Sequence, residues 1–455
     1  MKTYQDWLKV GDDERKRKEF VRALIFEHQN SDDYKIAADA YKYYKHQNVT
    51  INNYQKILYT VTGAAIPDNW SANFKMATRH LYRFITQEVQ YLLANGVSWN
   101  NEDTEGKLGK GKKSFDRQIQ AAAKAAKWGK VAFGFYDKDH IEVFNYLEFV
   151  PLYDEMDGSI KAGVRFWQID KTKPLRATLY EMDGFTKYVW GTDTNLDEPK
   201  RAYIRTWTGT EADGEEISDE QNYPAFPVVP LWANSEHQSL LVGLREQIDC
   251  YDLIKSGFAN TVDEASIVYW TLQNAGGMDD VDLAKFVEKM KTVHAAYIDE
   301  EGATAESHTL EAPYQSREAL LDRLDSDMYR DAMALDLRKM ASGALTATEI
   351  LAAYEDLNAK VDDFEYQVID FIEGILAVAG LEDEPTFTRS QIVNKEESIQ
   401  VLVAASQFLS EEYVTEKILN LFGDGDKLDE VLTAIDANAV NRFNAEEEPE
   451  EPIEE

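Results

Sequence analysis

The chain has 455 residues, of which 83 are acidic and 48 basic, so its formal net charge is −35. A surface of this sign repels phosphate groups, which disfavours proteins that grip DNA through a basic face. The negative charge does not exclude a DNA conduit, because a channel through which DNA slides should not bind the DNA tightly. A high net charge is also expected in a large protein for a simpler reason, since it keeps the protein soluble. The hydrophobic fraction of 44% excludes wholesale disorder and predicts several folded units.

The single cysteine, Cys250, excludes an intrachain disulfide and is typical of a reducing compartment. The N-terminal sequence MKTYQDWLKVGDDERKRKEF lacks the apolar run of a signal peptide. No apolar stretch reaches the roughly 20 residues of a membrane span. We therefore expect a protein that is made in cytoplasm, or used in something assembled there, without a membrane partner.

The first part of the chain is predicted to be mostly helical. Ser31 can cap a helix over residues 31–46, which opens with acidic residues that suit a helix N-terminus. Apolar residues recur every three or four positions over 71–94, which predicts a second helix ended by an Asn-Gly pair. Residues 101–114 are predicted to form a polar loop.

The pattern changes to short strands between about residues 130 and 232, where aromatic and β-branched residues gather. Asp157-Gly158 and Asp183-Gly184 separate neighbouring strands and are typical of tight hairpins. This stretch is therefore predicted to be an antiparallel meander. Its later part, residues 211–227, is predicted to be a polar loop that leads into an extended return.

Two long helices are predicted on either side of a mixed insert. The first covers 239–265 and the second runs from Ser316 to about Lys339, where the sequence MASGAL breaks it. The first helix has an apolar stripe made of Leu240, Leu244, Ile248, Tyr251, the stem of Lys255, Phe258 and Val262. The insert contains two strand-like segments, SIVYWTLQN and HAAYID, and a short helix between them.

The last long helix has the clearest pattern in the chain. Thr346 and Glu349 have the spacing of a capping box, in which each side chain satisfies the other's backbone amide. Beyond them, apolar residues step by three and four at Ile350, Tyr354, Leu357, Val361, Phe364, Val368, Ile372 and Ile375. Short amphipathic helices are predicted after it, followed by the acidic end AEEEPEEPIEE, which cannot bury a core.

No constellation of residues indicates catalysis, a metal or a cofactor. Gly106–Lys113 nearly matches a phosphate-binding loop, but Lys113 stands where a hydroxyl is needed and no apolar strand directly precedes it. The seven histidines have no metal-ligand spacing, and Cys250 lies within a predicted helix as a packed small residue. We therefore expect neither an enzyme nor a metal or cofactor site.

The order of these elements resembles that of phage portal proteins, particularly the branch common in long-tailed phages of Gram-positive hosts. Four stretches carry the resemblance: NFKMATRHLYRFITQEVQYLLANGV, PLWANSEHQSLLVGLREQIDCYDLIKSGFANTVDEA, ASGALTATEILAAYEDL and FLSEEYVTEKIL. Each is a packing pattern, and their order over most of the chain is what makes the match specific.

The resemblance implies an α+β subunit of several domains. They are a wing at 1–235, with a helical start and a β meander at about 130–232; stem helices at 236–265 and 314–338; an α/β clip at 266–313; a tunnel loop at 339–346; a long wing helix at 347–384; a helical crown at 385–443; and a disordered acidic tail at 444–455, which is not part of the family's pattern.

The resemblance also implies a homo-oligomeric ring, usually a dodecamer, at one capsid vertex of the virion, assembled in the host cytoplasm. Double-stranded DNA would pass through its channel without sequence specificity during packaging, retention and ejection. The ring would dock the terminase, the major capsid or scaffold protein, and a head-completion adaptor. No cofactor is implied.

Within that framework, an acidic channel wall is predicted at Glu246, Asp249 and Asp252, because repulsion would let DNA slide. Arg338 and Lys339 are candidate phosphate contacts, since they are cations beside a flexible break; their alternative role is to cap the second stem helix at its C-terminal end. The tunnel loop comprises Lys339, Met340, Ala341, Ser342, Gly343, Ala344 and Leu345. The clip strands are predicted to pair between neighbouring subunits, because short strands are not stable alone.

Two other interpretations remain open. Another ring-forming virion or scaffold protein shares the acidic composition, but it does not account for paired long helices around a mixed insert. A packaging ATPase or a nucleotide-dependent hydrolase would require nucleotide turnover that depends on Lys112.

Overall fold

The computed structural model describes residues 2–59, 63–69, 71–101, 103–191, 197–210, 216–265, 269–273, 279, 281–282, 284–286, 288, 304–308, 314–340, 347–390, 395–422, 427–428 and 430–435. The chain forms two compact units: one is Met1–Ala334 with Leu357–Arg389, and the other is Leu335–Asp356 with Ser390–Glu455. The larger unit combines helices with antiparallel sheets, so the predicted α+β class is confirmed. None of the described helices combines the length and the apolar character that a membrane span requires.

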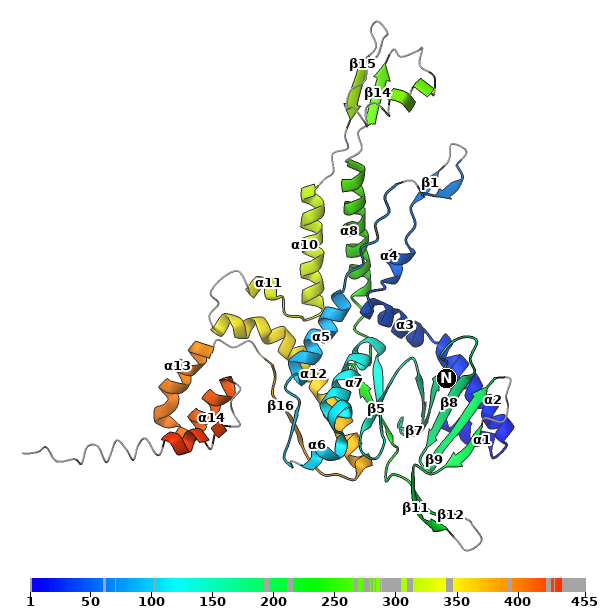
Figure 1. Ribbon diagram of the computed structural model, residues 1–455, viewed down its shortest axis with the longest axis vertical. Helices are drawn as coiled ribbons and strands as arrows, with labels where there is room; N and C mark the ends of the chain where they lie inside the picture. The colour runs from blue at the N-terminus through cyan, green and yellow to red at the C-terminus, as the bar shows by residue number, and fades with distance from the viewer. Residues whose placement is uncertain are drawn as a thin grey trace, which may run out of the picture. The chain divides into compact units, whose positions relative to one another are not determined.

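A five-stranded antiparallel sheet is covered on one face by the two N-terminal helices, α1 (Tyr4–Val10) and α2 (Glu14–Asn30) (Figure 1). Its strand order is β10-β9-β8-β7-β6. The strands are β6 (Phe149–Tyr153), β7 (Ile160–Trp167), β8 (Leu175–Glu181), β9 (Gly184–Trp190) and β10 (Glu198–Arg201).

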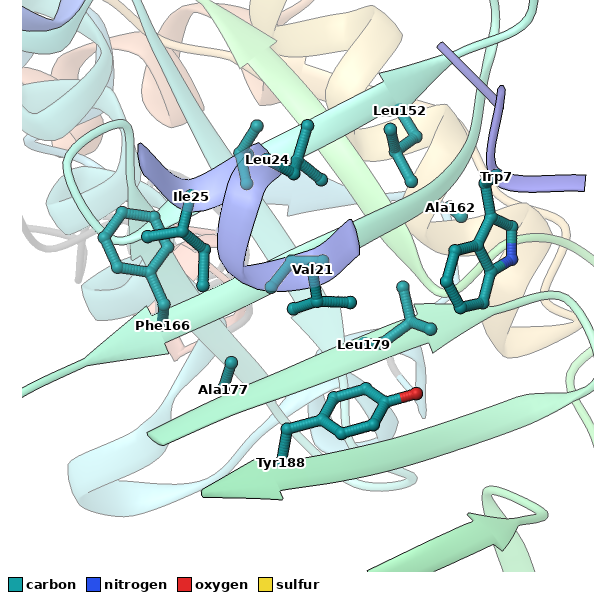
Figure 2. Close-up of a cluster of buried hydrophobic side chains, with 12 residues drawn as sticks. Trp7, Val21, Leu24, Ile25, Leu152, Ala162, Phe166, Ala177, Leu179 and Tyr188 are labelled. Carbon is teal, nitrogen blue, oxygen red and sulfur yellow. The ribbon is translucent and has the colours of Figure 1, made fainter. Parts of the chain in front are cut away.

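The core under these helices is built from one face of α2 and alternate residues of the strands. Figure 2 shows Leu24 and Ile25 of α2 above Leu179 of β8, and Trp7 of α1 closes one side at 3% exposure. Asp13 fixes the start of α2 because its carboxylate accepts the amides of the first helical turn. The apolar burial then stabilises both helices on the sheet.

The two predicted hairpin turns are confirmed: Asp157-Gly158 lies between β6 and β7, and Asp183-Gly184 lies at the turn between β8 and β9. The loop predicted at 211–227 is wrong in part. It contains β12 (Glu216–Gln221), which pairs with β11 (Ile204–Thr210). The strand EISDEQ is mostly acidic and lacks apolar alternation, so its pairing with β11 defines it rather than its own propensity.

A second sheet, of order β13-β4-β5, packs against two helices. The elements are β4 (Val131–Tyr136), β5 (Ile141–Asn145), β13 (Val228–Trp232), α7 (Phe115–Gly129) and α12 (Ala347–Ala379). Glycine allows α12 to lie close: a Cβ on Gly134 would be 2.6 Å from Cζ of Phe371, and one on Gly374 would be 2.5 Å from Cγ1 of Val229. The predicted apolar stripe of this helix is confirmed by buried Leu357, Val361, Phe364, Val368, Ile372 and Ile375.

Three helices connect this core to the rest of the larger unit: α3 (Asp32–Tyr44), α4 (Val49–Asn53) and α5 (His80–Leu93). Ser31 caps α3 as predicted, since its side chain accepts the amide of Tyr34. The helix predicted over 71–94 is too long by nine residues at its start, because α5 begins only at His80.

Several short elements lie around this body. They are α6 (Asp103–Leu108), a 3-10 turn at Gly111–Lys113, and the strand pairs β1 (Ile57–Tyr59) with β2 (Ala65–Pro67) and β3 (Val97–Trp99) with β16 (Pro385–Phe387). The polar loop predicted at 101–114 therefore contains helical turns, held by fully buried Leu108. Because β16 pairs with β3, the predicted crown boundary at 385 falls inside the larger unit.

Two antiparallel helices, α8 (Arg245–Ala265) and α10 (Tyr314–Asp331), lie side by side in the larger unit (Figure 1). Between them in the chain, β14 (Tyr269–Gln273) pairs with β15 (Thr304–His308). The first predicted strand of the insert is thus confirmed, whereas HAAYID lies outside the described residues. The second long helix is shorter than predicted: it ends at Asp331, and Met333 takes a left-handed conformation with φ of 48°.

The smaller unit is helical in its described part. It contains α11 (Leu337–Met340), the first turns of α12, α13 (Lys395–Ala405) and α14 (Glu411–Phe422). The two short helices predicted after α12 are confirmed by α13 and α14. Thr346 and the acidic tail at 444–455 lie outside the described residues.

Candidate functional site at the paired helices

The pair formed by α8 and α10, called here the stem pair, is joined by aromatic and polar contacts. Phe258 and Tyr314 meet edge to face, with ring centroids 5.5 Å apart. Nη1 of Arg317 donates to Oγ1 of Thr261 at 2.7 Å. At the opposite end the amide of Gln247 donates to Asp331. A helix pair held in this way depends on further neighbours for its stability.

The face of α8 that turns away from solvent is polar. Asp252, Ser256 and Asn260 recur every four residues and are all buried. Oγ of Ser256 accepts the amide of Met76 at 2.9 Å, and Oδ1 of Asn260 accepts the amide of Phe74 at 2.7 Å.

These bonds explain why the predicted helix over 71–94 starts late. In residues 71–79 the chain is extended along α8, and side chains of α8 accept backbone amides that a helix would have bonded internally. The apolar stripe predicted on α8 is correspondingly wrong in its second half, since Val262 is 46% exposed.

The three predicted wall carboxylates have different surroundings. Asp252 is fully buried and accepts a hydrogen bond from Asn48, and burial raises the pKa of its carboxyl group. The prediction that it faces a channel is therefore wrong. Asp249 accepts bonds from the hydroxyl groups of Tyr43 and Thr50, which leaves its side chain 17% exposed. Only Glu246 is exposed to solvent.

A buried histidine ties both stem helices to α5. Nε2 of His80 lies 2.9 Å from Oδ1 of Asp325 in α10, and its ring meets Tyr251 of α8 edge to face. Its Nδ1 lies 2.9 Å from the hydroxyl of Thr78. Burial lowers the pKa of His80 although Asp325 opposes this. The neutral ring therefore donates from Nε2 and accepts at Nδ1.

A buried ionic cluster lies at the end of the stem pair where α8 begins and α10 ends. Glu88 of α5 is fully buried between the ammonium groups of Lys127 from α7 and Lys360 from α12. Lys127 also donates to the carbonyl of Ala233, shortly before α8, and Lys360 donates at 2.9 Å to that of Ala332, directly after α10. The cluster thus fixes where the chain enters and leaves the pair.

The charges in this cluster depend on one another. Burial raises the pKa of Glu88, but the two lysines outweigh it and hold that pKa below its ordinary value. Burial lowers the pKa of Lys127, against the opposing effect of Glu88. Sequence reasoning missed the cluster. The available signal was a carboxylate at position 88, on the apolar face of the helix predicted over 71–94.

The candidate DNA contacts lie in the smaller unit. Arg338 forms a forked interaction with Asp336, with Nε 3.1 Å from Oδ1 and Nη2 3.2 Å from Oδ2, and its side chain is 63% exposed. Lys339 and Met340 end α11, and their side chains, like all of Ala341–Leu345, lie outside the described residues. Because α10 ends at Asp331, neither cation is in its last turn, so the predicted capping role is wrong.

The segment that resembles a phosphate loop does not have the strand–loop–helix form of one. Gly106 lies within α6, and Nζ of Lys113 lies 2.6 Å from Nε2 of His140. Among the described residues one group, Asp137, His140 and Glu142, has the spacing of a metal site. The ammonium group of Lys113 already lies against its histidine, so the cluster is satisfied without a metal.

The stem pair carries the β14–β15 hairpin and is joined to an α+β body. Residues 24–440 match the model of the phage portal protein family, SPP1 Gp6-like, and the chain belongs to this family. The predicted family is thereby confirmed, and with it a structural component of a phage virion. The match favours a portal protein over the other ring-forming scaffold protein considered above.

One curated relative and two solved structures show the degree of similarity. The portal protein of Clostridium phage phiCD119 is 24% identical over 271 residues, which are 57% of this chain and 58% of that protein, so the match spans less than two thirds of the relative. A solved structure described as the neck of an empty GTA particle, computed with C6 symmetry, has a TM-score of 0.48 at 9% identity and covers 76% of this chain and 90% of its own. The neck of a native GTA particle, computed with C12 symmetry, has a TM-score of 0.44 at 9% identity, with 74% and 89% covered. At these scores the likeness is too slight to define the fold.

Proposed function

We propose that the chain is one subunit of a closed homo-oligomeric ring around the DNA channel at a capsid vertex. In this role the ring admits the genome during packaging, retains it and releases it at ejection. The stem pair is the observation that carries the proposal, because two antiparallel helices that expose much of their surface need neighbours beside them. Repetition of such contacts around an axis closes a ring.

The parts of the subunit are assigned accordingly. The stem is α8 with α10, the clip includes the β14–β15 hairpin, and the wing is the sheet-containing body with α12. The segment between α11 and α12 is the tunnel loop, and α13 with α14 belong to the crown. We further propose that the ring docks the terminase, the capsid or scaffold protein and a head-completion adaptor.

The channel is proposed to be acidic, so that DNA passes without being held. Glu246 supports this as the exposed carboxylate of the predicted wall, and the net charge of −35 per chain supports it for the ring as a whole. Arg338 stays a proposed phosphate contact because its guanidinium is exposed, although Asp336 already holds it in one orientation.

The mass and shape of the purified chain test the ring. Twelve chains of 51.9 kDa would weigh about 620 kDa. We expect particles of that order with a central hole in negative-stain images. A monomer of 51.9 kDa at all protein concentrations would contradict the proposal.

Charge reversal tests the DNA contacts separately. Arg338→Glu with Lys339→Glu is expected to leave the ring intact and to reduce the amount of DNA packaged, because it places carboxylates beside the passing phosphates. Lys112→Glu is the matched control, since Lys112 is an exposed cation outside the stem and the loop. Equal packaging by both variants would remove the proposed role of Arg338 and Lys339.

A further inference from the structure

A cavity of about 390 Å³ lies between α4, the chain that follows it, and the stem pair. Its polar lining includes Lys56, Thr261 and Arg317, and no carboxylate is among the residues around it. In a chain with 83 acidic residues, a hollow bordered by two cationic side chains and no acid is a place where an anionic group fits.

Arg317 has capacity left for such a group. Its Nη1 donates to Oγ1 of Thr261 and lies 3.5 Å from the carbonyl oxygen of Gly257, and both acceptors are neutral. No carboxylate among the described residues forms an ion pair with it. A guanidinium group carries five N–H donors in a fork that matches a carboxylate.

An exposed apolar arm borders the same cavity. The arm is residues 54–59 with 65–67, which leave the cavity at Lys56 and form the β1–β2 pair. Ile57 is 54% exposed, Leu58 41% and Tyr59 75%. A two-stranded sheet of this size is marginal by itself, and an apolar cluster on it marks a contact surface.

The outer face of α10 has the complementary character. Glu318 and Asp322 lie one helical turn apart on the same side of α10 and are both exposed. Within the described part of the chain neither carboxylate has an ion-pair partner. Neither lines the cavity of its own chain, so the two surfaces can meet only between copies.

We propose that the outer face of α10 in one subunit seats against the cavity and arm of a second copy. The carboxylates of Glu318 and Asp322 approach Arg317 of the second copy, whose apolar arm borders the same contact. This inference rests on the proposed ring and names the contact that builds it. The contact joins two different faces of the same chain, so it repeats head to tail around an axis.

Charge reversal on each face tests the contact in the full chain. Arg317→Glu is expected to increase the fraction of unassembled chain roughly tenfold or more, because it sets a carboxylate against carboxylates. Glu318→Arg with Asp322→Arg should do the same from the other face while removing no bond within the chain. Arg323→Glu, an exposed reversal on the same helix, is the control that should still assemble.

Mixing the two defective chains gives the decisive result. The Arg317→Glu variant has an acidic cavity and an acidic face on α10. The variant with Glu318→Arg and Asp322→Arg has a basic cavity and a basic face on α10. In a ring made of either variant alone, every contact brings like charges together. In a ring in which the two variants alternate, every contact pairs opposite charges. We expect the mixture to assemble to the size of the wild-type particle in mass photometry.

The outcomes separate this inference from the function on which it rests. If the wild-type chain forms no ring, the proposed function fails. If the wild type forms a ring and Arg317→Glu assembles equally well, only the inferred contact fails. The same holds if the wild type forms a ring and the mixture of the two variants does not assemble. If Arg317→Glu keeps the ring but loses binding of a labelled DNA duplex, the cavity holds phosphate and the inference is overturned.

Discussion

At the scale of single residues, the most consequential group is Glu88. It is the carboxylate between Lys127 and Lys360, and the two lysines donate to the carbonyls of Ala233, in the segment before α8, and of Ala332, directly after α10. A buried carboxylate with two cationic partners is expensive to remove, because the cations would then stay buried without compensation.

Replacement of Glu88 by leucine should therefore lower the free energy of unfolding by about 3–5 kcal/mol. The double variant with Lys127→Met should be more stable than Glu88→Leu alone, since it removes one of the two cations that lose their partner. Urea unfolding of both variants measures the difference. Equal stability of the single and double variants would show that the ionic cluster has no such coupling.

His28 gives a pH-dependent prediction. Its ring is buried against Tyr34 and Tyr146, its Nε2 lies 2.9 Å from the carbonyl oxygen of Tyr146, and burial lowers its pKa below the ordinary 6.5. As pH falls through 6.5 the unfolded chain takes up a proton that the folded chain refuses, so stability decreases.

His28→Gln keeps a donor for the Tyr146 carbonyl and removes this titration. It should be less stable than the wild type at neutral pH, because the ring packing is lost. Between pH 7.5 and 5.5, however, the stability of His28→Gln should decrease less than that of the wild type. Parallel losses in the two proteins over that interval would contradict the assignment.

At the scale of elements, α8 shows how a helix can bury polar residues. Ser256 and Asn260 are buried because they accept amides of the extended segment 71–79. Removing one acceptor leaves a backbone amide unsatisfied. Asn260→Ala should therefore cost about 1–3 kcal/mol of unfolding free energy.

Cys250→Ala is the matched control on the same helix, since Cys250 is exposed, and it should change stability by less than about 0.5 kcal/mol. Thermal unfolding of the two variants compares them. An Asn260→Ala protein as stable as Cys250→Ala would mean that water replaces the lost acceptor.

The close approach of α12 to its sheet gives the second prediction at this scale. Gly134→Ala places a methyl group within 2.6 Å of the Phe371 ring, so overpacking should cost about 1–3 kcal/mol. In Gly257→Ala of α8 the methyl group meets nothing within 4 Å, and helix propensity should instead stabilise the protein by about 0.5–1 kcal/mol. Opposite shifts in melting temperature are expected, and shifts of the same sign would contradict the packing account.

The elements also show what periodicity can and cannot predict. The stripe of α12 was predictable because its most deeply buried residues are apolar and recur with helical spacing. The start of α5 and the buried face of α8 were not, since each depends on hydrogen bonds to a segment distant in sequence. The strand β12 was not predictable either, because its residues lack apolar alternation and it is defined by pairing with β11. Likewise, Glu246 could be placed on the surface, but the partners of Asp249 and Asp252 come from α3 and the residues after it.

At the scale of the whole molecule, membership in the portal family could be recognised from the order of elements along the chain. The contact between subunits could not, because Lys56, Arg317 and Asp322 are unremarkable in an acidic sequence until the fold separates them onto different faces. In the proposed ring, assembly depends on two mixed surfaces, while the proposed DNA path depends on the net acidic charge.

The central claim is that the stem pair lies around the channel of a ring, and the single cysteine offers a direct measurement. Cys250 is exposed on α8, so a maleimide-gold label reports the position of the stem in electron microscopy of the assembled chain. The account predicts labels clustered around the central hole. Labels at the outer rim of the particle, or labelled monomers without a ring, would contradict it.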